Sequence, residues 1–211
     1  MKKTIGKLCV ITDTVVQTKY THEELAAKAI EGGADIIQFR DKSMPTGVMI
    51  DTAKRIKMLC ESFDERKILF IVNDRVDVAL ASDADGVHLG LDDIPIRSAR
   101  RLLGDNKIIG GTAHYLKEAL KAERAGADYI GYGHIFNTRS KIKFTRPVGP
   151  GELAEICKQV KTKIIAVGGI DLDNVKQVIE AGAFGIAVIG AVAKADDPLK
   201  AVKKLREIVY A

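Results

Sequence analysis

The 211-residue sequence has no tryptophan, only 5 prolines and only 3 cysteines. Cys9, Cys60 and Cys157 are odd in number and lack the spacing of metal ligands, so we expect reduced thiols in a cytoplasmic protein. No apolar run approaches the roughly 20 residues that a membrane span requires. The run Leu8–Ile11, which follows a basic start, is too short for the core of a signal peptide. We therefore expect no membrane partner.

A strong charge of one sign is also lacking, because 33 Lys and Arg face 28 Asp and Glu, a formal net charge of +5. The densest basic cluster, Lys200 to Arg206, has apolar residues at helical spacing and is typical of a solvated helix face. Aromatic residues make up only 5% of the chain, so a stacking platform for nucleic acid is not supported. Basic residues placed singly near Gly and Asp would instead suit a small anionic ligand.

Short apolar, β-branched runs recur along the whole chain, with helix-length spacers between them. No linker or low-complexity segment interrupts this pattern, so residues 1–211 are interpreted as one domain. The eight predicted strands are Leu8–Ile11, Ile36–Phe39, Ile68–Val72, Gly86–Leu89, Ile108–Gly110, Tyr129–Tyr132, Ile164–Val167 and Gly185–Ile189. The predicted helices are Glu23–Ile30, Val48–Cys60, Ile96–Leu103, Leu116–Ala125, Gly151–Val160, Leu172–Ala181 and Pro198–Val209.

An internal repeat precedes the even-numbered strands: Gly33-Ala34-Asp35, Asp83-Ala84-Asp85, Gly126-Ala127-Asp128 and Gly182-Ala183-Phe184. Such turns end a helix and start a strand. Eight repeating units in this length predict a single compact (β/α)8 TIM barrel. An open doubly wound sheet is the alternative, but the first strand ends in Thr12-Asp13-Thr14, without the glycines of a dinucleotide-binding loop.

In such a barrel the active site lies at the carboxyl ends of the strands. Strand 2 ends in Gln38-Phe39-Arg40-Asp41-Lys42, and alternation places Gln38 and Arg40 on the inner face, with Phe39 under the helices. A surface Arg–Asp pair would be the ordinary interpretation of this segment. A glutamine and two cations at a strand end favour an anion site.

Carboxylates follow the next two strands, in Asn73-Asp74-Arg75 and in Leu91-Asp92-Asp93. Beside an anion site they suit Mg²⁺, which prefers a few oxygen ligands together with water and substrate phosphates. Each segment could equally be a helix cap or a turn. Their coincidence with Arg40 and Lys42 favours a metal and a diphosphate.

Phosphate-binding features follow the later strands. The segment from Ile135 to Gly149 is long, polar and basic, and it contains Thr138, Ser140 and Lys141, although a solvated loop would also be so charged. Gly168-Gly169 after strand 7 and Gly190 after strand 8 would let backbone N–H groups approach a phosphate.

The four histidines are weighed separately. His22 is expected at the surface and His88 inside the barrel, where hydrogen bonds would satisfy it. His114 and His134 lie at strand ends and are candidates for proton transfer, with a structural role favoured for each.

Several longer motifs resemble the thiamine-phosphate synthase family, over nearly the whole chain and in order. They are Gln38-Phe39-Arg40-Asp41-Lys42, Asn73 to Leu80, Ala84 to Gly90, Ala127 to Gly131, Phe136-x-Thr138-x-Ser140-Lys141 and Gly168-Gly169-Ile170. The resemblance implies a Mg²⁺-dependent transferase that joins a hydroxymethylpyrimidine diphosphate to a thiazole phosphate, carboxylated or not, and releases pyrophosphate by a dissociative step. Its partners would be these phosphorylated small molecules, and the oligomeric state is left open.

The resemblance also assigns residues to each role. Asp74 and Asp93 would hold Mg²⁺, while Arg40, Lys42 and Lys141 would be the catalytic cations. The pyrimidine diphosphate would contact Gln38, Arg40, Lys42, Asn73, Thr112 and Lys141. The thiazole phosphate would contact Thr138, Ser140, Gly169, Ile189 and Gly190.

Four positions depart from the family pattern, namely Leu91, Thr112, His134 and Gly190. Thr112 and Gly190 each stand where serine is usual, and Leu91 replaces a glutamine. His134 replaces a proline and resembles the related thiazole tautomerases, in which such a histidine transfers protons. A tautomerase with His134 as acid and base is therefore one alternative, and a non-catalytic barrel that binds phosphorylated ligands is another.

Overall fold

Eight parallel strands form a closed ring in the computed structural model, which describes residues 4–16, 18–63, 66–138 and 146–211. In sequence order each strand pairs with the next, and β8 pairs with β1 to complete the barrel. The strands are β1 (Leu8–Thr12), β2 (Ile36–Phe39), β3 (Leu69–Asn73), β4 (Gly86–Leu89), β5 (Ile108–Ala113), β6 (Tyr129–Tyr132), β7 (Lys163–Val167) and β8 (Gly185–Val188). The predicted (β/α)8 barrel is confirmed.

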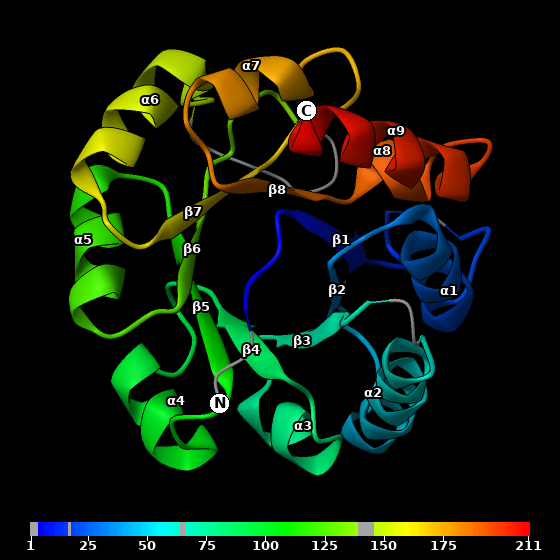
Figure 1. The fold of residues 1–211 in the computed structure, drawn as a ribbon. Helices are drawn as coiled ribbons and strands as arrows, with labels where there is room; N and C mark the ends of the chain where they lie inside the picture. The colour runs from blue at the N-terminus through cyan, green and yellow to red at the C-terminus, as the bar shows by residue number, and fades with distance from the viewer. Residues whose placement is uncertain (1–3, 17, 64–65, 139–145) are drawn as a thin grey trace.

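Helices surround this ring on the outside, and α9 packs against α1 (Figure 1). The helices of the described residues are α1 (His22–Gly32), α2 (Thr46–Glu61), α3 (Val76–Ala81), α4 (Ile96–Leu103), α5 (Leu116–Arg124), α6 (Gly149–Gln159), α7 (Val175–Glu180), α8 (Gly190–Ala193) and α9 (Pro198–Tyr210). The sequence analysis assigned no helix at α3 or α8, and it began α7 three residues too early.

Local sequence explains how α1 begins and ends. Thr21 caps α1, since its side chain accepts from the N–H of Glu24 while Glu24 accepts from the N–H of Thr21. The helix ends at Gly33, whose φ of 107° lies in the left-handed region that glycine tolerates. These signals fix the first residue of α1 as His22, directly after the cap.

Alternation along the strands divides the apolar side chains into two cores. Leu8 and Val10 of β1 belong to the large cluster that strands and helices share. Cys9 and Ile11 belong to a second, smaller cluster built almost entirely from strand residues, which fills the barrel interior. A residue's parity within its strand therefore decides whether its side chain faces the barrel axis or the helices.

The repeated turns before the even-numbered strands close the amino-terminal end of the barrel. The first three turns end in an aspartate whose Oδ2 accepts a hydrogen bond of 2.8–2.9 Å from a backbone N–H of the preceding odd strand. These aspartates and their donors are Asp35 with Leu8, Asp85 with Phe70, and Asp128 with Ile109. The fourth turn has Phe184 in place of the aspartate, and its ring centroid lies 4.1 Å from Lys163 Nζ. The repeat therefore has a structural use at the end opposite the strand carboxyl termini.

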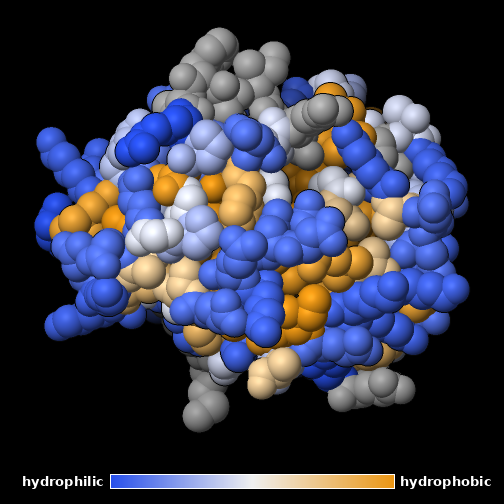
Figure 2. Space-filling model, turned by 90° about the horizontal axis from the view of Figure 1, so that it is seen from above, coloured by the Kyte–Doolittle hydropathy of each residue, from blue (hydrophilic) through white to orange (hydrophobic). Residues whose placement is uncertain are grey.

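The outer surface is polar in the view of Figure 2, where hydrophilic side chains surround smaller hydrophobic areas. Among the described residues, no helix has the length and the apolar character needed to cross a bilayer. The charged outer faces of the helices fit the alternation of buried and exposed positions along them.

We predict that Asp85→Asn lowers the free energy of unfolding by about 2 kcal/mol, because it removes the buried partner of Lys57 and leaves its ammonium group only the exposed carboxylate of Glu61, at 3.1 Å. Lys57 Nζ lies 2.8 Å from Asp85 Oδ1, and the two side chains are 9% and 2% exposed. Burial by itself would lower the pKa of Lys57, but the hydrogen bond and charge of Asp85 raise it. Urea unfolding measures the change.

The matched control is Asp83→Asn, two residues earlier, where the side chain is 83% exposed and pairs with Lys107. It should cost less than about 1 kcal/mol, as is usual for exposed pairs. Equal losses in the two variants would show that the buried pair has no special weight.

Candidate active site

The inner face of β2 carries the first predicted site residue. Gln38 is 4% exposed inside the barrel, and its Nε2 lies 4.0 Å from Cys9 Sγ. Phe39 points the other way and is fully buried in the layer beneath the helices. The predicted opposition of these two side chains is confirmed, so Arg40, the next residue, begins a loop at the barrel mouth.

Arg40 forms an ion pair with Asp13, which follows β1, rather than with its sequence neighbour Asp41. Its side chain is only 13% exposed. Arg40 Nε is buried and has no hydrogen-bond partner among the described residues. A buried donor without an acceptor is costly. The guanidinium group therefore keeps one N–H without an acceptor among the described residues.

Lys42, Asp74 and Asp93 form a second charged cluster at the same end of the barrel. Lys42 Nζ contacts Asp74 Oδ2 directly, and the carboxyl groups of Asp74 and Asp93 lie close enough to shift each other's pKa. Asp93 is oriented by its own turn, because its Oδ2 accepts from the N–H of Gly90 at 2.7 Å. The two aspartates predicted to act together are thus neighbours.

The proximity of these two carboxyl groups shifts their titration in opposite directions. Burial and the adjacent Asp74 raise the pKa of Asp93. Burial also acts to raise the pKa of Asp74, but the interactions with Asp93 and Lys42 outweigh burial and lower that pKa. A pair of carboxyl groups in contact favours either a shared proton or a cation between them.

This donor set fits Mg²⁺. Two carboxylates supply hard oxygen ligands, and Mg²⁺ usually takes one or two from the protein, with water and substrate phosphates completing its coordination. Among the described residues no group of three or more His, Cys, Asp or Glu side chains could hold a metal.

Polar side chains line the barrel interior below this cluster. Asn73 ends β3 and is 7% exposed. His88 on β4 has Nδ1 3.1 Å from the Tyr129 hydroxyl and Nε2 3.0 Å from Thr112 Oγ1. The expected internal, hydrogen-bonded role of His88 is confirmed, and it orients the hydroxyl of Thr112.

The loops after β6 and β7 lie against each other. Gly169 has φ of 69°, and a Cβ there would stand 2.5 Å from the carbonyl oxygen of Asn137, so only glycine fits this approach. The contact places Gly169 beside Asn137, which directly precedes Thr138 in the sequence. Ile189 and Gly190 follow β8 directly, with Gly190 opening α8. Ser140 and Lys141 lie outside the described residues.

His114 and His134 line a separate cavity of about 130 Å³ between the ends of β5 and β6 and the start of α6. Tyr115, Arg146 and Glu152 also line it. None of the described residues assigned to the metal, the diphosphate or the thiazole phosphate is among its lining. His114 Nδ1 contacts the carbonyl oxygen of Gly133, and His134 is 6% exposed.

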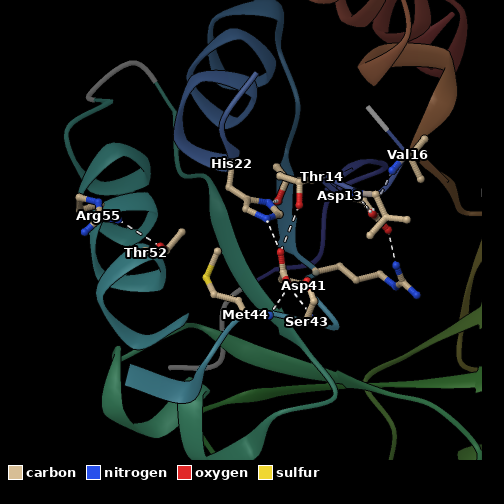
Figure 3. Close-up of polar contacts among 12 residues, drawn as sticks. Asp13, Thr14, Val16, His22, Asp41, Ser43, Met44, Thr52 and Arg55 are labelled. Atoms are coloured by element: carbon tan, nitrogen blue, oxygen red, sulfur yellow. Dashed lines mark hydrogen bonds and ion pairs between the residues drawn. The ribbon is translucent and has the colours of Figure 1, made fainter. Parts of the chain in front are cut away.

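The sequence analysis was wrong about His22, which is not at the surface but 3% exposed. His22 Nε2 lies 3.1 Å from Asp41 Oδ2, and Nδ1 lies 2.8 Å from Thr12 Oγ1 (Figure 3). Neither His22 nor Asp13 was assigned to the site. The available signal was indirect: an aspartate after the first strand and a histidine directly after a helix cap, with partners that are distant in sequence.

Asp41 is the centre of this network. Besides His22, it accepts hydrogen bonds from the Thr14 hydroxyl, from the N–H and hydroxyl of Ser43, and from the N–H of Met44. Burial raises the pKa of Asp41, but the hydrogen bonds from Ser43, His22 and Met44 outweigh it and lower the pKa to about 2. The carboxylate is therefore strongly favoured over the acid.

A closed (β/α)8 barrel with cations, paired carboxylates and glycine loops at one rim belongs to the class of barrel proteins that bind phosphorylated small molecules. Sequence comparison identifies the family. The thiamine monophosphate synthase family matches residues 8–192, and the chain belongs to it.

Named relatives agree with this assignment. A thiamine-phosphate synthase of Chlorobium phaeobacteroides is 46% identical over 202 residues, which is 96% of this chain and 95% of that protein. The solved structure of a thiamine phosphate pyrophosphorylase from Pyrococcus furiosus is 45% identical, with a TM-score of 0.87 over 97% of this chain and 95% of that chain. A 3-hexulose-6-phosphate synthase, 20% identical with a TM-score of 0.66, shares the fold alone.

We predict that the stability contributed by Asp41 is complete above about pH 5 and is lost progressively as the pH falls to about 1. The reason is that the unfolded carboxyl group titrates at about 3.9, whereas the folded pKa is about 2, so acid protonates the unfolded chain first. Asp41→Asn should cost about 2 kcal/mol at pH 7 and reduce the loss of stability between about pH 5 and 1. Urea titrations at several pH values measure both effects.

Asp51→Asn, on the exposed face of α2, is the control and should stay within about 0.5 kcal/mol of the parent. An Asp41→Asn variant with the parent's stability at every pH would refute the assignment.

Proposed function

We propose that this chain is a thiamine-phosphate synthase, a transferase that couples 4-amino-2-methyl-5-hydroxymethylpyrimidine diphosphate with 4-methyl-5-hydroxyethylthiazole phosphate. The products are thiamine phosphate and pyrophosphate. The family membership supports the reaction, and one observation of the site supports it most directly. Arg40 carries a buried N–H that has no partner among the described residues. It lies at the same rim as Lys42 and the Asp74–Asp93 pair, where a diphosphate group would meet cations and a metal site together.

The chemistry asks for charge stabilisation rather than for a nucleophilic side chain. The C–O bond between the pyrimidine methylene and the diphosphate breaks, and its electron pair leaves with the diphosphate. The thiazole nitrogen then donates its lone pair to the methylene carbon, forming the new C–N bond. Arg40, Lys42 and Lys141 would bind the departing diphosphate, and fixed cations in a shielded site stabilise such developing charge strongly.

Asp74 and Asp93 would hold Mg²⁺ beside these cations. When bound, Mg²⁺ neutralises charge on the diphosphate oxygens and so lowers the barrier to their departure. Asp93 is oriented for this by the N–H of Gly90. Lys42 contacts Asp74 and would keep that carboxyl group ionised, as a metal ligand must be.

The remaining assigned residues would position the two ligands. Gln38, Asn73 and Thr112 would contact the pyrimidine diphosphate from the barrel interior, where His88 holds the Thr112 hydroxyl. Thr138, Ser140, Gly169, Ile189 and Gly190 would hold the thiazole phosphate. Holding the thiazole beside the methylene converts a bimolecular capture into a nearly unimolecular one. We place the reaction in the cytoplasm because the cysteines are few and odd in number.

The test is a single incubation of the purified protein with both phosphorylated precursors and Mg²⁺. Thiamine phosphate and pyrophosphate should form in equal amounts, and EDTA should abolish both. Absence of both products would refute the proposal. Conversion of the thiazole to its tautomer instead would support the tautomerase alternative through His134, and binding of the precursors without any product would support a non-catalytic barrel.

We predict that Asp74→Asn and Asp93→Asn each lower kcat by about a hundredfold, since removal of one group that stabilises the developing charge commonly costs 10²–10³ in rate. Raising the Mg²⁺ concentration should recover part of the lost rate. Steady-state kinetics across a Mg²⁺ titration measure both effects. Asp51→Asn is the control for charge change on the surface. Unchanged rates and unchanged Mg²⁺ dependence in both site variants would refute the metal assignment.

A further inference from the structure

The loops after β1 and β2 hold each other through two aspartates that use their oxygens in the same way. Asp13 Oδ1 accepts from the N–H groups of Val15 and Val16 within its own turn, at 2.9 and 3.3 Å, while Oδ2 pairs with Arg40 on the neighbouring loop. One oxygen thus holds the turn after β1, and the other binds the loop after β2. Asp13 therefore provides one of two links between these loops.

Asp41 provides the second link between the two loops. Its Oδ1 accepts from the N–H groups of Ser43 and Met44 at 2.8 and 2.7 Å. Its Oδ2 accepts from Thr14, which follows β1, and from His22 at the start of α1. Figure 3 shows His22 and Thr14 on one side of Asp41, with Ser43 and Met44 on the other. The turn after β2 therefore has a fixed shape and a fixed position.

His22 is itself held on three sides. A carboxylate can only accept hydrogen bonds, so Nε2 carries the ring proton and donates to Asp41. Nδ1 is then the acceptor for the Thr12 hydroxyl. The ring of Phe39 packs edge-on against the imidazole, with ring centroids 4.7 Å apart. The side chain thus ties α1 to the ends of β1 and β2, and it has little freedom to move.

Asp41 stands between the two cations that the proposed reaction needs. Arg40 precedes it and reaches back to Asp13, whereas Lys42 follows it and reaches forward to Asp74. A shift of the Asp41 backbone would displace the adjoining backbone of both Arg40 and Lys42, since each is joined to it by one peptide bond. Without His22, Oδ1 would still shape the turn, but Oδ2 would keep only the longer contact to Thr14, at 3.2 Å.

We propose that His22 is a positioning residue for the diphosphate site: by holding Asp41 Oδ2 it sets where Arg40 and Lys42 meet a pyrophosphate group. This role rests on the function proposed above. His22 touches neither substrate nor the reacting atoms, and its effect is confined to the diphosphate. The thiazole phosphate, which we propose binds at the loops after β6, β7 and β8 rather than at the loop after β2, should be insensitive to it.

Two substitutions separate this role from simple packing. In His22→Gln the side-chain amide reaches the place of Nε2 and keeps the donor to Asp41, but loses Thr12. In His22→Asn the amide reaches only the place of Nδ1, so it keeps Thr12 and loses Asp41. Thr14→Val removes the second donor to Asp41 Oδ2 without changing side-chain shape, and it serves if His22→Asn does not fold.

The first readout is the dissociation constant of inorganic pyrophosphate with Mg²⁺, measured by calorimetry, which needs no turnover. The second is the KM for each substrate. His22→Asn should raise the pyrophosphate Kd and the KM for the pyrimidine diphosphate about tenfold, since small misplacements of binding groups have large effects. The KM for thiazole phosphate should stay within about twofold. His22→Gln should restore parent values, and Thr14→Val should follow His22→Asn more weakly.

The control for lowered stability is Asp85→Asn, at the opposite end of the barrel, which should reduce the free energy of unfolding without changing either Kd or KM. Equal values for His22→Asn, Thr14→Val and the parent would overturn the proposal, as would equal losses in His22→Asn and His22→Gln. If the parent forms both products and binds pyrophosphate, such a result leaves the proposed function intact. If the parent does neither, both proposals fail.

Discussion

The backbone hydrogen bonds that join β8 to β1 are the interaction on which the rest of this structure depends. They close eight parallel strands into a ring without a free edge, pairing Leu8 with Ile186 and Val10 with Val188. Closure gives every strand an inside and an outside, and it brings all eight carboxyl ends to one rim. Residues such as Asp13, Arg40, Asp74 and Asp93, which are spread over some 80 positions of the chain, meet for that reason alone.

The two ends of the barrel use aspartate in different ways. At the amino-terminal end, Asp35, Asp85 and Asp128 accept from strand N–H groups and pair with cations, which contributes stability. At the other end Asp13 pairs with Arg40, Asp74 pairs with Lys42, and Asp74 and Asp93 are neighbours. The first arrangement is satisfied by strand N–H groups and cations of the protein. The second leaves Arg40 Nε without an acceptor among the described residues and brings two carboxyl groups together, which supports the proposed binding of an anion with a divalent cation.

Much of this organisation could be predicted from the sequence because it follows from local rules. Parity within a strand placed Gln38 inside and Phe39 outside, and His88 in the interior. The position of Asn73-Asp74 and Asp93 after neighbouring strands predicted that the two aspartates lie together. His22 defeated the same reasoning, since a histidine beside two glutamates on a helix is typically exposed. Its burial results from Thr12, Phe39 and Asp41, none of which lies near it on that helix.

Local patterning thus decides the elements, their order and the face on which each strand side chain stands, because apolar period and turn chemistry act over a few residues. Tertiary structure alone decides the partners. Arg40 could have paired with Asp41, its neighbour in the chain, yet Asp41 is already saturated by Ser43, Met44, Thr14 and His22, so Arg40 pairs with Asp13. A carboxylate has few acceptor positions, and only the folded chain determines which donors occupy them.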